Sequence, residues 1–140
     1  MKTKIIRIEE VFLIVPIQYQ PPYQTLAEYK NCCGAGTGFQ EKIVPDTMWG
    51  LSISAACHIH DFCWEMADAK WSNFHQSNSM FLHNLMAIIR ARSNSFTRML
   101  RNYRAITMFD AVDMVGASHF WDLKHICPPA VDMPTEEELV

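Results

Sequence analysis

The chain has 140 residues, of which 49% are hydrophobic and 19% charged, and its formal net charge at pH 7 is -3. Such a chain holds one domain with a genuine core, and its composition excludes an intrinsically disordered protein. The acidic balance argues against a nucleic-acid binder that relies on a basic face, and against recruitment to anionic lipid by charge alone.

The five cysteines do not follow the spacing of a small disulfide-dense module. They are Cys32, Cys33, Cys57, Cys63 and Cys127. An odd number excludes complete pairing within the chain. One or two bridges with a leftover thiol, or no bridge at all, are both open at this point.

The N-terminal segment is expected to be an ordered, extended arm. Two short apolar runs, 5–8 and 11–17, are separated by Glu9 and Glu10. This interruption does not fit a signal peptide, and neither run is long enough to span a bilayer. We therefore predict an arm followed by a short helical turn at 25–30, in a protein that is cytoplasmic or exported by a non-standard route.

A glycine-rich segment follows the arm. Gly34, Gly36 and Gly38 favour an irregular loop in which the backbone comes close to another group. Residues 43–44 indicate a short strand, and residues 45–46 a turn.

Two helices are expected directly after this loop. The first takes Ser52 or Ser54 as its N-cap and continues to about Trp71. The second begins near Gln76 and carries a broad apolar face with a period of 3.6 residues. That face contains Met80, Phe81, Asn84, Leu85, Ile88 and Ile89.

A third helix is expected beyond a break at Ser93, Asn94 and Ser95, and Gly116 should end it. Its periodic apolar positions are Phe96, Met99, Leu100, Tyr103, Ile106 and Thr107. Prolines and three consecutive glutamates then predict a loose acidic tail over 127–140. The sequence thus predicts an all-α fold with two to three long packed helices.

The most specific chemical signal lies in the first helix. Cys57, His60 and Trp64 are spaced so that they share one helix face. Asp61 is turned about 100° from His60 around the helix axis, so both side chains can border one cleft. A His-Asp pair alone is common, but this pair lies in a C-x-x-H-D-x-C motif downstream of a C-G-x-G sequence that begins at Cys33.

Loop and motif together resemble the phospholipase A2 superfamily, in particular its short bacterial and phage-like members. The match is detailed over 31–64, and a looser likeness extends as far as Trp121. By this resemblance, 31–126 is the catalytic domain, flanked by the arm at 1–30 and the tail at 127–140.

The resemblance implies a calcium site and a reaction at a membrane or micelle surface. The backbone carbonyls of Cys32, Gly34 and Gly36 and the carboxylate of Asp61 would bind calcium, a cation that prefers oxygen ligands. His60 would take a proton from the water that attacks the sn-2 ester of a glycerophospholipid. Calcium would stabilise the oxyanion that develops.

The chain departs from the family at two positions. Asn78 stands where the family has the carboxylate that orients the histidine, and Trp64 stands where it has a tyrosine. Asp110 or Asp113 could substitute for the carboxylate. Because an amide cannot neutralise an imidazolium, the alternative is a catalytically weakened relative that acts as a calcium-binding, lipid-binding or protein-interaction module.

The cysteines and His60 also leave other interpretations open. The resemblance implies a disulfide between Cys33 and Cys57 that tethers the loop to the helix. Without that bridge, Cys33, Cys57 and Cys63 could join His60 in a zinc site, and Cys57 or Cys63 could serve as a hydrolase nucleophile. A histidine satisfied within the core is the plainest reading of His60.

Overall fold

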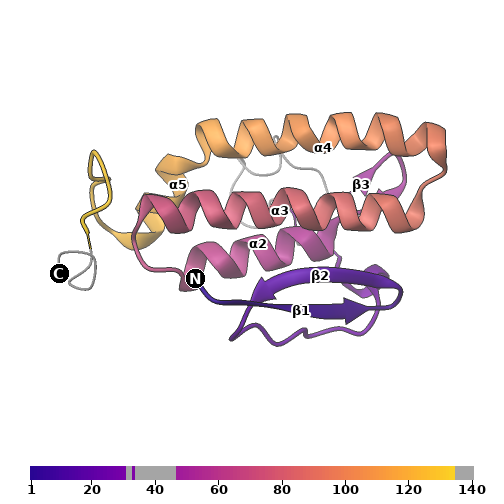
Figure 1. The fold of residues 1–140 in the computed structure, drawn as a ribbon, viewed down its shortest axis with the longest axis horizontal. Helices are drawn as coiled ribbons and strands as arrows, with labels where there is room; N and C mark the ends of the chain where they lie inside the picture. Colours follow the sequence, from indigo (N-terminus) through magenta and orange to yellow (C-terminus); the bar gives the residue numbers. More distant parts are fainter. Residues whose placement is uncertain (31–32, 34–46, 135–140) are drawn as a thin grey trace.

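Three long helices form the body of the molecule in the computed structural model, which describes residues 1–30, 33 and 47–134 (Figure 1). They are α2 (Ser54–Met66), α3 (Trp71–Arg92) and α4 (Ser95–Val115), and a short helix α5 (Ala117–Lys124) follows them. α3 is the central element, because it packs against both α2 and α4. Within the described ranges, no helix combines the length and the apolar character needed to cross a bilayer.

The expectation of an all-α fold is wrong, because antiparallel hairpins accompany the helices. The N-terminal hairpin pairs β1 (Thr3–Ile8) with β2 (Val11–Pro16), and a second, smaller one pairs β3 (Thr47–Met48) with β4 (Leu51–Ser52). A single turn of 3-10 helix, η1 (Leu26–Glu28), lies where the short helical turn was predicted. The fold is therefore mixed α/β.

The N-terminal hairpin is formed by the segment that was expected to be an ordered, extended arm. Ile8 and Val11 form the last pair of the ladder, so the two glutamates between the apolar runs become its turn. Arg92 at the end of α3 forms ion pairs with both Glu9 and Glu10. The side chains of β2 alternate, and those that are buried face the core: Val11, Leu13, Val15 and Pro16. Alternation of this kind is the signature of a half-buried strand.

A buried amide joins the N-terminal hairpin to α3. Asn84 is fully buried, its Nδ2 donates to the carbonyl of Ile14 at 2.8 Å, and its Oδ1 accepts from the Ile14 N–H at 2.8 Å. The side chain thereby pairs with both backbone groups of one β2 residue, as a neighbouring strand would. The hairpin is held in one register against α3.

The break between α2 and α3 comes earlier than predicted. α2 ends at Met66, and α3 begins at Trp71 rather than near Gln76. The carboxylate of Asp132 accepts the backbone N–H groups of Trp71 and Ser72. A carboxylate at this position accepts backbone N–H groups that have no partner within the helix, and it interacts favourably with the positive end of the helix dipole. It therefore fixes the start of α3.

The apolar face predicted for the second helix is confirmed, since all six of its residues are buried in α3. The face predicted for the third helix is wrong. Phe96 is 66% exposed and Tyr103 is 76% exposed. α4 instead buries Ala105, Met108 and Val112, whose smaller or more flexible side chains suit close packing on α3.

The predicted ends of the third helix are confirmed. Asn94 caps α4, with its side chain accepting the Thr97 N–H at 2.9 Å, and the helix ends at Gly116. A Cβ at Gly116 would lie 2.3 Å from the Val112 carbonyl oxygen and 2.7 Å from Cη2 of Trp64. Only glycine therefore allows the turn into α5 to pass this close to the indole of α2.

Replacing Gly116 by alanine should destabilise the fold. Alanine has the better helix propensity by about 1 kcal/mol, and Gly116 has a right-handed helical conformation that alanine adopts readily. The two close contacts outweigh that gain, and we expect a net loss of about 1–3 kcal/mol in the free energy of unfolding. Urea denaturation measures it, with Ser118→Ala as the exposed control. Equal midpoints for both variants would show that Trp64 does not lie against this glycine.

Candidate active site

α2 and α3 bring His60 and Asn78 into direct contact. Nε2 of His60 and Oδ1 of Asn78 are 2.8 Å apart. His60 is only 6% exposed and Asn78 is completely buried. The family resemblance placed Asn78 beside the histidine, and the two side chains are indeed in contact. The catalytic role of the pair stays a prediction.

Two further side chains form hydrogen bonds with the Asn78 amide. The indole Nε1 of Trp64 donates to Oδ1 of Asn78 at 3.2 Å, and Nδ2 of Asn78 donates to Oδ1 of Asp113 at 3.1 Å. Trp64 stands where the family has a tyrosine. Its indole N–H, in place of a tyrosine hydroxyl, donates to this amide. Asp113 belongs to the cluster, whereas Asp110 is exposed on the surface of α4.

From the sequence alone, Asp113 is one of two candidate carboxylates, the other being Asp110. The signal that could have separated it from Asp110 is its place next to Val112, which lies on the buried face of α4. That face itself was predicted wrongly, so the signal could not be used.

The imidazole of His60 lies among aromatic rings. Its centroid is 4.4 Å from the ring of Trp64 and 4.7 Å from the ring of Phe81. Burial lowers the pKa of His60 from 6.5 to about 4, and the hydrogen bond to Asn78 opposes this only in part. The ring is therefore neutral at physiological pH, the form in which a histidine can accept a proton.

Asp61 is a half-buried carboxylate whose charge no described side chain compensates. Burial and, to a smaller extent, repulsion from Glu65 raise its pKa from 3.8 to about 7. No hydrogen-bond donor or cationic side chain from the described part of the chain contacts it. A cation bound there would supply the missing positive charge, so the donor chemistry of Asp61 fits calcium.

The other predicted calcium ligands, Cys32, Gly34 and Gly36, lie outside the described residues. Among the residues with described positions, no three His, Cys, Asp or Glu side chains are grouped so that they could hold a metal ion. The predicted calcium site does not need such a group, because it takes one carboxylate and backbone oxygens.

Cys33 and Cys57 form a disulfide, as the resemblance implied, with their Cα atoms 5.0 Å apart. The bridge removes both sulfurs from any zinc site with His60. Cys63 is a buried free thiol, and burial raises its pKa to about 12. Its thiolate is therefore not formed at physiological pH, which removes Cys63 as a nucleophile.

His58 lies away from this cluster. Its Nδ1 is 2.7 Å from the hydroxyl of Tyr19, and its ring packs against Tyr29. The two histidines of the motif thus have separate surroundings, with only His60 in contact with Asn78.

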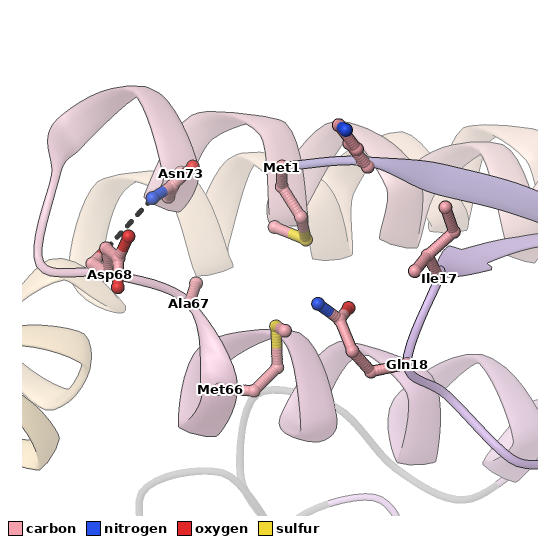
Figure 2. Close-up of a pocket in the computed structure, with 8 residues that line it drawn as sticks. Met1, Ile17, Gln18, Met66, Ala67, Asp68 and Asn73 are labelled. Carbon is pink, nitrogen blue, oxygen red and sulfur yellow. Dashed lines mark hydrogen bonds between the residues drawn. The ribbon is translucent and has the colours of Figure 1, made fainter.

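Three cavities with described lining residues lie away from this cluster, and neither His60 nor Asp61 lines any of the three. One of about 270 Å³ lies between the end of the N-terminal hairpin and the junction of α2 with α3, where Met1, Gln18, Met66 and Asp68 face one another (Figure 2). Another, of about 390 Å³, lies between the β3–β4 hairpin and α4, and the third, of about 370 Å³, between α5 and the segment after it. These cavities carry no part of the candidate site.

Comparison with known proteins assigns no function to the chain, so any assignment depends on the geometry described above. No family model matches the chain, and neither a curated protein nor a solved structure matches it. The likeness to phospholipase A2 therefore remains a resemblance of motifs.

The raised pKa of Asp61 predicts how the calcium-free protein responds to pH. The unfolded state loses this proton near pH 4 and the folded state near pH 7, so folding is penalised progressively across that window and fully above it. With calcium chelated, Asp61→Asn should therefore match the wild type near pH 4 and be more stable above pH 7, by about 2 kcal/mol after discounting for partial exposure. Urea denaturation at both ends of the window measures this.

Asp122→Asn, at an exposed position on α5, is the matched control for that comparison. It should follow the wild type at every pH. If Asp61→Asn does the same, the carboxylate of Asp61 is not held in an unfavourable environment.

Proposed function

We propose that the chain is a calcium-dependent hydrolase that cleaves the sn-2 ester of glycerophospholipids at a membrane or micelle surface. The observation that carries this proposal is the placement of a buried, neutral His60, held by Asn78, next in the chain to Asp61, whose carboxylate no described side chain compensates. A general base and an anionic ligand on adjacent positions are what a metal-assisted attack by water requires.

In this proposal His60 takes the proton of the attacking water and Asn78 keeps the imidazole oriented. No covalent intermediate is needed, which agrees with the lack of an available nucleophile in the described site. Calcium, held by Asp61 and the backbone carbonyls of Cys32, Gly34 and Gly36, would polarise the ester carbonyl and stabilise the oxyanion.

The amide of Asn78 limits the expected rate. A hydrogen bond to a charged partner contributes about 1.5–3 kcal/mol, against about 0.5–1.5 kcal/mol for a neutral one. The imidazolium that forms during turnover is therefore less stabilised than beside a carboxylate, and a rate about ten-fold lower follows. This same feature favours the second candidate function, a non-catalytic module that binds calcium, lipid or a protein.

Removing the base should abolish hydrolysis. We expect purified wild type to release fatty acid from a short-chain phosphatidylcholine with calcium and not with a chelator. His60→Gln should lose at least about a hundred-fold of that activity, the lower range for general-base catalysis. His58→Gln is the matched control, because His58 lies in the same motif and bonds to Tyr19 instead. A wild type that cleaves no phospholipid would leave the binding-module function.

Calcium affinity should depend on Asp61. It is the one side chain in the proposed ligand set, so Asp61→Asn should weaken calcium binding by about ten-fold or more. Isothermal titration calorimetry measures the affinity, and the neighbouring Glu65→Gln controls for the loss of one negative charge on the same helix. Equal affinities in wild type and Asp61→Asn would place any bound calcium elsewhere.

A further inference from the structure

The amide of Asn78 can occupy its site in only one orientation. An indole N–H is always a donor, so the group that faces Nε1 of Trp64 must be the carbonyl oxygen. A carboxylate accepts, so the group that faces Oδ1 of Asp113 must be the NH2. Reversing the amide would set two donors against each other at Trp64 and two acceptors against each other at Asp113.

This orientation decides which nitrogen of His60 carries the proton. Nε2 faces Oδ1 of Asn78, which has no hydrogen to give. Nε2 must therefore donate, and in the neutral ring the lone pair is left on Nδ1. No partner for Nδ1 is found among the residues that the structure describes. Nδ1 is the nitrogen left to accept a proton from water.

Asp113 contributes to this arrangement from a third helix and without touching His60. It accepts from Nδ2 of the amide, whereas the imidazole faces Oδ1, so it can act on His60 through Asn78. The other group that faces its carboxylate is His75 of α3, whose Nδ1 is 3.3 Å from the same oxygen. His75 is exposed and donates to Asp113 only when Nδ1 carries a hydrogen, whereas the Asn78 amide always donates.

We propose that Asp113 is a positioning residue of this site. By accepting from Nδ2 of Asn78, it holds the amide in the orientation that keeps the proton of His60 on Nε2 and the lone pair on Nδ1. Trp64 enforces the same orientation from α2. The catalytic meaning of this role rests on the proposed function, but the tautomer it fixes is a property of the folded protein whether or not a lipid is cleaved.

The test is the tautomer of His60, read from the 15N chemical shifts of its ring in labelled protein at neutral pH. Asp113→Leu removes the acceptor at similar volume, and we expect the ratio of the two neutral tautomers to shift by about ten-fold toward Nδ1–H. Asp113→Asn keeps a carbonyl that can accept but adds an NH2 that can face a reversed Asn78, so its shift should be smaller. Asp110→Asn, with the same change on the same helix, should leave the ratio within about two-fold of wild type.

Asp113→Asn preserves the shape of the side chain, so it keeps the test valid if the leucine variant does not fold. A tautomer ratio that is unchanged in Asp113→Asn and in any folded Asp113→Leu protein would overturn the proposal. A shift in either variant that is absent in Asp110→Asn would support it.

Activity is a separate arm of the experiment. If the wild type hydrolyses phospholipid, Asp113→Leu should lower kcat by about ten-fold with KM little changed, and Asp113→Asn should restore part of the loss. If the wild type is inactive while the tautomer still responds to Asp113, the proposed function fails and the positioning role stands. If activity is present and the tautomer does not respond, the positioning role fails alone.

Discussion

The structure depends on one buried side chain, the amide of Asn78. It lies on the central helix α3, accepts from His60 and Trp64 of α2, and donates to Asp113 of α4. A fully buried amide is costly unless its donors and acceptors are satisfied, so this cluster forms only when all three helices have the correct rotation and register. The contacts of Asn78 therefore constrain both the packing of the bundle and the geometry of the candidate site.

A second buried amide on α3 has a similar effect. Asn84, also fully buried, satisfies both of its polar groups on the backbone of Ile14 and so aligns the N-terminal hairpin. The apolar contacts of α3 supply most of the driving force for packing, but they tolerate small sliding movements. The two amides remove that freedom, one toward the hairpin and one toward α2 and α4. α4, which is fixed near its C-terminal end through Asp113, leaves Phe96 and Tyr103 exposed in its N-terminal half.

The sequence predicts the helices of this protein better than their surroundings. A single dominant apolar stripe identifies the buried face of α3, and Asn94 and Gly116 mark the ends of α4 by their capping chemistry. Periodicity fails on α4 because two apolar faces compete there, and only tertiary contact with α3 selects the smaller one. The hairpin was missed because its turn is Glu9-Glu10 rather than Asn-Gly, and it becomes favourable through Arg92, far away in sequence. The position of Asn78 beside His60 could be predicted from the family resemblance, whereas the link to Asp113 required the fold.

Burial drives the two motif residues toward neutrality by opposite routes. His60 loses affinity for its proton, and Asp61 gains affinity for one. A divalent cation beside Asp61 would lower the pKa of this carboxyl, because it stabilises the charged form. The cation would not raise the pKa of His60, because it also repels a proton from the nearby imidazole. Under the proposed function, binding of calcium would thus leave Asp61 charged and His60 neutral, the pair of states that attack by water needs. In the proposed function, the low dielectric of the site, which is unfavourable for each side chain alone, would let the two residues act together once a cation is bound.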